Sequence, residues 1–189
     1  GALALIAAFF VVPTDKTVDT TELIGQHLND FDAGDAKRMK IVKFDSDTAS
    51  TREFEVAEEN GLWRIPSKEG YPADATKQMA EAATSLIDRE ILRIAATSPT
   101  EHEKLGVVDP TGKLNSQAQG VGTRVTLHDI DNSVLTDMII GKKVKDADGQ
   151  RYVRDADKDV VYVVNMDPKA LTTKFEDWIE GDLLTINPF

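Results

Sequence analysis

The chain contains no cysteine among its 189 residues. This absence excludes disulfide bonds, thiolate nucleophiles and cysteine-ligated zinc, and it fits an oxidising or a reducing compartment equally well. Basic residues are also comparatively few, because 22 lysines and arginines face 33 aspartates and glutamates and leave a formal net charge of −11. A charge of this sign repels phosphate backbones and anionic lipid surfaces, so we expect no nucleic-acid partner.

Long apolar runs are absent except at the N-terminus, where Ala2 to Val12 are all apolar. As a helix this segment would be about 16 Å long, roughly half of a bilayer core. It could be the trailing half of a membrane anchor, the core of a signal peptide, or a buried element of the domain. We favour the anchor, because no small-residue cleavage site precedes Pro13 and the acidic flank that follows is typical of the non-cytoplasmic side. The side chains expected to contact lipid are Leu3, Leu5, Ile6, Phe9, Phe10 and Val11.

The next regular pattern predicts a meander of three strands followed by a long helix. The runs 39–44, 52–56 and 62–65 alternate like strands and are separated by turn-forming residues. Pro72 and Asp74 then predict the start of a helix, and Pro99 predicts its end. Apolar residues at three-and-four spacing would form one face of this helix, namely Met79, Ala83, Leu86, Ile87, Ile91 and Ile94.

The C-terminal part repeats this plan. The runs 123–130, 133–141, 151–155 and 159–165 are rich in β-branched residues and are joined by Asp, Asn and Gly, which favours hairpins. Asp167 and Pro168 predict the start of a second helix. The apolar face of that helix would consist of Leu171, Phe175, Trp178 and Ile179.

These patterns predict an α+β fold. We expect two antiparallel β-meander plus amphipathic helix units, preceded by an N-terminal apolar helix of the transmembrane type. The units form either two similar subdomains or one larger sheet with both helices on one side. The expected division is part of a membrane anchor (1–12), a tether (13–37), a first unit (38–99), a connection (100–122) and a second unit (123–189). Because the chain starts with Gly1 instead of Met and stops soon after the second helix, we expect it to be a piece of a longer protein.

No motif for a metal, a cofactor or a catalytic group is complete. The alternating Asp155, Asp157 and Asp159 resemble the start of a calcium loop, but the sixth position is Val160 and the twelfth is Met166, where glycine and glutamate are required. The three histidines, His27, His102 and His128, are too widely spaced to suggest a shared metal ion. A dinucleotide fingerprint and a G-x-S-x-G elbow are also missing. We therefore predict no cofactor and no enzymatic activity, with a hydrolase as the less favoured alternative.

Two groups of side chains are candidates for a binding site, one for a cleft between the two units and one for an anion. Trp63, Tyr152 and Arg154 could line such a cleft, although aromatic residues at strand spacing are more often part of a core. Arg151 and Arg154 could bind an anion, or they could lie across a strand face and pair with Asp155. Of these two interpretations we favour the surface ion pairs.

Several ordered blocks of sequence carry a family resemblance. The most telling are the W-x-I-P…PAD junction that starts at Trp63 and the YVR…VYVV…FEDW tail, with LGVVDP and IIGKKV between them. From about Lys40 to the C-terminus the chain resembles the bacterial family known as domain of unknown function 4340. This resemblance implies a membrane-anchored protein with most of its mass outside the cytoplasm, in some members associated with ABC-type export or gliding-motility transport. It implies no catalytic residues, and it implies that the chain continues beyond LLTINPF.

We therefore expect a non-enzymatic, membrane-tethered domain on the extracytoplasmic (periplasmic) face. It would act as an accessory or interaction subunit of a membrane protein complex such as an ABC-type transport system. Its expected partners are membrane lipid, through the N-terminus, and integral membrane protein subunits. The alternative is a receptor domain that binds a small ligand between the two halves.

Overall fold

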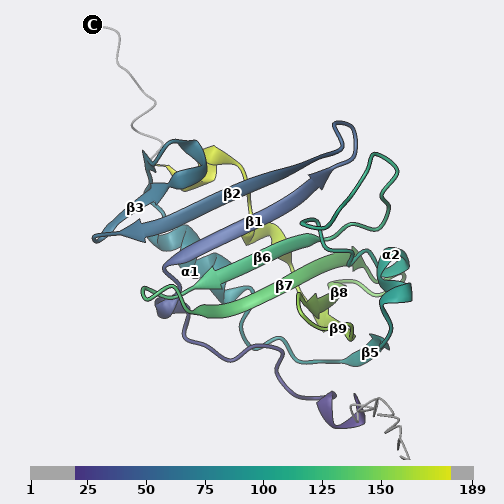
Figure 1. Ribbon diagram of the computed structural model, residues 1–189. Coiled ribbons are helices and arrows are strands. Elements are labelled where there is room, and N and C mark those ends of the chain that lie inside the picture. The colour runs from purple at the N-terminus through teal and green to yellow at the C-terminus, as the bar shows by residue number, and fades with distance from the viewer. Residues whose placement is uncertain (1–19, 180–189) are drawn as a thin grey trace, which may run out of the picture.

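The computed structural model describes residues 20–179, which form one nine-stranded antiparallel sheet with a short helix, α1, packed against one face (Figure 1). The predicted membrane anchor, including Leu3, Leu5, Ile6, Phe9, Phe10 and Val11, lies outside the described residues. Within residues 20–179, none of the helices has the length and hydrophobicity needed to cross a bilayer.

The first predicted meander is present and gains a short fourth strand. Its strands are β1 (Arg38–Asp45), β2 (Ser50–Glu59), β3 (Leu62–Ile65) and β4 (Tyr71–Pro72). The β1–β2 turn forms because the Asp45 carboxylate accepts hydrogen bonds from the backbone N–H groups of Asp47 and Thr48, at 3.0 and 3.3 Å. A 3₁₀ turn, η3 (Pro66–Lys68), links β3 to β4.

The second meander is also present, and it continues the same sheet. Its strands are β6 (Thr123–His128), β7 (Val134–Lys143), β8 (Gln150–Asp155) and β9 (Val161–Asn165). β1 pairs with β6, so Ile41 lies opposite Val125, and the strand order is β4-β3-β2-β1-β6-β7-β8-β9-β5. The two meanders therefore form one sheet, which decides between the two arrangements that the sequence left open.

Strand alternation gives the sheet two differently covered faces. On β7, Met138 and Ile140 belong to the main core with α1, whereas Ile139 belongs to a smaller cluster with Leu105 and Val107 on the other side. We refer to these sides as the α1 face and the outer face. The main core contains Met39, Ile41, Phe54, Val56, Met79, Ala83, Leu86, Val125, Leu127, Val153, Tyr162, Val164 and Trp178.

The predicted long helix between Pro72 and Pro99 is wrong in length. α1 spans only Thr76–Thr84, and Pro72 pairs with Arg64 in β4 instead of starting the helix. The helix ends because the Ser85 hydroxyl donates to the Ala82 carbonyl at 2.6 Å, and Asp88 then takes a left-handed conformation with φ 52°. Met79, Ala83 and Leu86 are buried as expected.

Beyond α1 the chain enters an edge strand, β5 (Arg93–Ala96), which pairs with β9. Ile91 and Ile94 therefore reach the core from an extended segment, where β-branched side chains fit better than in a helix. The described part of the predicted tether contains two 3₁₀ turns, η1 (Thr20–Leu23) and η2 (Ala33–Asp35). It lies along the segment before β5, since Gly25 N–H donates to the Ile91 carbonyl at 2.9 Å.

The second predicted helix is also wrong. In its place are two 3₁₀ turns, η5 (Pro168–Ala170) and η6 (Phe175–Trp178). Asp167 caps η5 as predicted, but the Thr172 hydroxyl accepts from Lys174 N–H at 3.1 Å and donates to the Asp177 carboxylate at 2.6 Å. These local hydrogen bonds compete with helix formation. Leu171 and Trp178 are nevertheless buried in the core.

Candidate functional site

The segment before β6 forms a long loop on the outer face. It follows η4 (Pro99–Glu101) and α2 (His102–Leu105) and runs from 106 to 122 without helix or strand. We call residues 106–122 the anchored loop. Figure 1 shows that this loop and the β1–β2 turn project from the same end of the sheet. Most side chains between 111 and 119 are exposed, as are those between 46 and 53.

Backbone contacts hold both ends of the anchored loop in place. Val108 N–H donates to the Gly120 carbonyl at 3.0 Å, and Gly122 N–H donates to the Val108 carbonyl at 2.8 Å. Gly120 has a left-handed φ of 65°, and a Cβ atom at this position would overlap the backbone carbonyl of Glu103. Only glycine allows the loop to pass α2 this closely.

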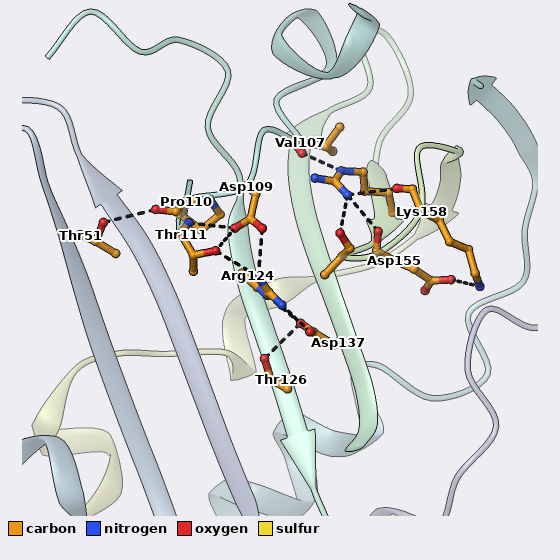
Figure 2. Close-up of polar contacts among 12 residues, drawn as sticks. Thr51, Val107, Asp109, Pro110, Thr111, Arg124, Thr126, Asp137, Asp155 and Lys158 are labelled. Carbon is orange, nitrogen blue, oxygen red and sulfur yellow. Dashed lines mark hydrogen bonds and ion pairs between the residues drawn. The ribbon is translucent and has the colours of Figure 1, made fainter. Parts of the chain in front are cut away.

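Arg124 is the centre of the polar contacts beneath the loop, as Figure 2 shows. Its Nε and Nη2 atoms donate to the two carboxylate oxygens of Asp137, at 2.9 and 2.6 Å, and its Nη1 donates to Asp109 at 2.9 Å. The Thr126 hydroxyl donates to the same Asp137 carboxylate at 3.1 Å. Arg124 and Asp137 come from neighbouring strands of the sheet, whereas Asp109 comes from the loop, so the guanidinium joins loop to sheet.

Asp109 in turn shapes the start of the loop. Its second carboxylate oxygen accepts from the backbone N–H and the hydroxyl of Thr111, at 2.8 and 2.7 Å. The neighbouring Pro110 carbonyl accepts from the Thr51 hydroxyl of β2 at 3.3 Å. The loop is thereby linked to β2 as well as to β6 and β7.

The electrostatics of this network favour a fixed ion cluster over a proton-transfer site. The hydrogen bonds to Asp137 raise the pKa of the Arg124 guanidinium above its ordinary value, and the charge of Asp109 adds to this effect although partial burial opposes it. Every nitrogen of this guanidinium already donates to a carboxylate. Among residues 20–179, no group of three histidine, aspartate or glutamate side chains is arranged to hold a metal ion.

Arg154 holds the loop between β8 and β9 in the same way. Arg154 is buried, with 6% exposure. Its Nη1 donates to the carbonyls of Asp155, Ala156 and Lys158 at 2.9 to 3.0 Å. Its Nε donates to the Val107 carbonyl at 2.9 Å. The expected pairing of Arg154 with the Asp155 carboxylate is therefore wrong, since that carboxylate pairs with Lys158. Burial lowers the pKa of Arg154, and the carboxylates of Asp109 and Asp159 oppose this effect.

The three residues predicted to share a cleft are not brought together. Trp63 lies on β3 and packs against the main core of the α1 face. Tyr152 and Arg154 lie on β8 and, by strand alternation, on the outer face, where Tyr152 packs on the smaller core cluster. The strands β2, β1, β6 and β7 separate β3 from β8.

Comparison with known protein families supports the resemblance found in the sequence. The family model described as Domain of unknown function (DUF4340) matches residues 63–189. The chain belongs to this family. Neither the curated proteins nor the solved structures contain a match to this chain. The DUF4340 match begins at Trp63, so it includes the anchored loop and the Arg124 network but not β1 and β2.

The sequence analysis missed the Arg124 network, although signals for it exist. Asp109 lies within LGVVDP, one of the blocks on which the DUF4340 resemblance rests. Asp137 is the one acidic residue of β7 and is followed by the apolar run Met138–Ile140, and Arg124 and Thr126 alternate with buried Val125 and Leu127. A charged residue inside a β-rich run indicates a partner on the neighbouring strand.

Proposed function

We propose that this DUF4340 chain is a non-enzymatic, membrane-tethered extracytoplasmic domain that acts as an accessory or interaction subunit of a membrane protein complex, such as an ABC-type transport system. The observation that carries the proposal is the anchored loop. Loops longer than about 12–15 residues without secondary structure are uncommon in compact domains, and they are usually functional. Here the Asp109–Arg124 contact and the Gly120 crossing hold such a loop on the sheet.

The exposed part of the loop suits recognition of another protein. Thr111, Gly112, Lys113, Asn115, Ser116 and Gln117 are all exposed. A loop whose ends are already fixed loses little conformational entropy on binding, which favours affinity. The β1–β2 turn projects beside it, so a partner could contact both segments at once (Figure 1).

The proposed location follows from the N-terminal sequence. The apolar stretch from Ala2 to Val12 and the acidic residues after Pro13 favour a membrane anchor with its following domain outside the cytoplasm. Membrane lipid and integral membrane subunits are then the expected partners. Fractionation tests this part: the native full-length protein should stay with membranes through high-salt and carbonate washes. Recovery in the soluble fraction would contradict the tether.

Co-purification tests the interaction directly. The full-length protein is extracted from its own membranes in a mild detergent, and bound membrane subunits are quantified for the wild type and for a variant in which residues 111–118 are replaced by a Gly/Ser segment of equal length. The proposal predicts a stoichiometric membrane-protein partner for the wild type. Loss of the loop side chains should reduce its recovery at least about tenfold, since interface energy concentrates in few residues.

A matched control replaces the exposed β6–β7 turn, residues 130–132, which lies at the opposite end of the sheet. This variant should retain the partner. The interaction role would be refuted if the wild-type protein were recovered alone. Equal partner recovery for both variants would refute the anchored loop as the binding surface.

A further inference from the structure

A pocket of about 350 Å³ opens at the ends of the central strands, between side chains of the α1 face and the ends of the anchored loop at Gly106, Val121 and Gly122. Its floor is formed by Thr123 and Ile140, and Pro168 and Leu171 form an apolar wall. Lys43 and Arg151 also line it. We call this space the Lys43–Arg151 pocket; it is separate from the Arg124 network, which lies on the outer face.

The sheet register explains why these residues meet. Val42 pairs with Arg124, which places Lys43 opposite Thr123 one residue further along β1 and β6. Thr123 pairs with Ile140 on β7, and Arg151 alternates with the core residue Val153 on β8. Lys43 and Arg151 are thus three strand spacings apart, about 14 Å, and stand on opposite sides of a floor made by β6 and β7.

The charge of the pocket is opposite to that of the chain. Its charged lining residues are Lys43, Lys142 and Arg151, and no carboxylate lines it, although acidic residues outnumber basic ones by 33 to 22 in the whole chain. Lys142 donates to the backbone carbonyls of Glu103 and Lys104, at 3.4 and 3.1 Å. The charge of Arg151 helps to lower the pKa of Asp167, whose carboxylate pairs with Lys169 at 3.2 Å.

Lys43 is the most informative of these cations. Its amine has a single hydrogen bond among residues 20–179, a long one of 3.5 Å to the Thr173 hydroxyl, and no carboxylate of that part of the chain lies within 4.0 Å. The side chain is half-buried, and this burial lowers the pKa of Lys43. Placing a cation here without a counter-ion costs free energy, and such a cost is typical of a binding position.

Arg151 leaves donors free for a ligand as well. Its Nη1 donates to the Gly141 carbonyl at 3.0 Å, which fixes the guanidinium over β7. No other hydrogen bond of this guanidinium is formed with residues 20–179. The free edge of a guanidinium fits the two oxygens of a carboxylate or phosphate.

We propose that the Lys43–Arg151 pocket binds a small organic anion that carries a carboxylate or a phosphate group. The oxyanion lies between the Lys43 amine and the Arg151 guanidinium and accepts from the Thr123 hydroxyl. The apolar wall of Pro168 and Leu171 contacts the uncharged part of the ligand. A second pocket of about 690 Å³ shares Lys43, but its lining combines Arg52 and Lys68 with the carboxylates of Asp45 and Glu53, and Asp45 pairs with Arg52.

The test is a titration of the full-length protein with inorganic phosphate and, separately, with succinate, at constant ionic strength. Binding is followed by NMR, through the backbone amides of Gly122 and Thr123 and the side-chain Nε–H of Arg151. With phosphate, with succinate or with both, we expect saturable chemical-shift changes that are confined to these groups. Saturation by phosphate alone or by succinate alone identifies which oxyanion the pocket accepts.

The variants Lys43→Met and Arg151→Met should each weaken binding at least about tenfold, as expected for loss of a charged hydrogen bond. Lys77→Met is the matched control, because this lysine is 91% exposed on α1 and does not line the pocket. The affinity of the Lys77→Met variant for the titrated anion should stay within about twofold of the wild-type value, as is usual for a distant surface change. Equal weakening in all three variants, or no saturable shift in the wild type with either probe, would overturn the proposal; the wild-type result stands even if a variant fails to fold.

Discussion

At the scale of single residues, Arg124 and Arg154 differ from Lys43 in the number of hydrogen bonds that their charged groups form with the rest of the domain. Arg124 and Arg154 donate to carboxylates and to backbone carbonyls and thereby hold loops on the outer face. Lys43, on the α1 face, has one long hydrogen bond. The two arginines contribute to the stability of the fold, whereas the charge of Lys43 is expected to reduce it.

Removal of Arg124 should destabilise the domain. Arg124→Met leaves Asp109 and Asp137 without their shared cation, and both are only 28% and 26% exposed. We expect a loss of about 2 kcal/mol in the free energy of unfolding, measured by urea denaturation at pH 7. Lys40→Met is the control, because its partner Glu53 is 52% exposed, and its loss should be below about 0.5 kcal/mol. Similar losses for both variants would show that the Arg124 network is an ordinary surface ion pair.

Replacement of Lys43 should have the opposite effect. Burial lowers the pKa of Lys43 from 10.5, so the charged amine reduces the free energy of unfolding at neutral pH. In phosphate-free buffer, Lys43→Met should therefore raise stability at pH 7 by up to about 1 kcal/mol, a value limited by the partial exposure of the side chain. Because the amine is neutral in both states above pH 10.5, the difference should narrow as the pH rises toward that value. Urea denaturation at pH 7 and pH 10 measures this; a less stable variant at pH 7 would contradict it.

At the scale of elements, the strands follow from the sequence and the helices do not. The alternation of apolar and polar residues, together with the turn residues, predicted β1, β2, β3 and β6 to β9, because strands and turns of this kind are determined by local sequence. The predicted length of the first helix was wrong because the apolar spacing continues from Met79 through Ile94. The left-handed conformation of Asp88 and the pairing of β5 with β9, which end the helix early, are set by tertiary contacts. The second helix failed because hydrogen bonds of Thr172 override the apolar pattern.

The anchored loop gives a prediction at this scale. Gly120→Ala should destabilise the domain by at least about 2 kcal/mol, because alanine is strained at positive φ and its Cβ would overlap the Glu103 carbonyl. Amide hydrogen exchange at residues 108 and 122 should become faster, since their hydrogen bonds close the loop. Gly112→Ala, in the same loop, meets only the Asp109 carbonyl at 3.4 Å and should stay within about 0.5 kcal/mol of the wild type. Equal effects of the two changes would mean that the loop is not fixed at Gly120.

At the scale of the whole molecule, one pairing determines the architecture. β1 and β6 are separated by more than 70 residues, yet their pairing joins two meanders into a single sheet. The sequence predicts each meander but contains no local signal for that junction, because register between distant strands depends on packing of the whole core. The same pairing places Lys43 opposite Thr123, which is why the Lys43–Arg151 pocket could not be predicted from spacing.

The central claim is that the anchored loop faces a membrane-complex partner outside the cytoplasm, and cysteine labelling tests it most directly. Lys113→Cys in the loop and Asp131→Cys at the opposite end of the sheet each add one thiol at an exposed position of these 189 residues, which contain no cysteine, and their labelling is measured relative to the unsubstituted protein. A membrane-impermeant maleimide is added to intact spheroplasts and, separately, to protein dissociated in detergent. The account predicts that both variants are labelled in spheroplasts, and that only Lys113→Cys is labelled several times more slowly there than in detergent. Labelling only after lysis, or equal rates for Lys113→Cys in both conditions, would contradict it.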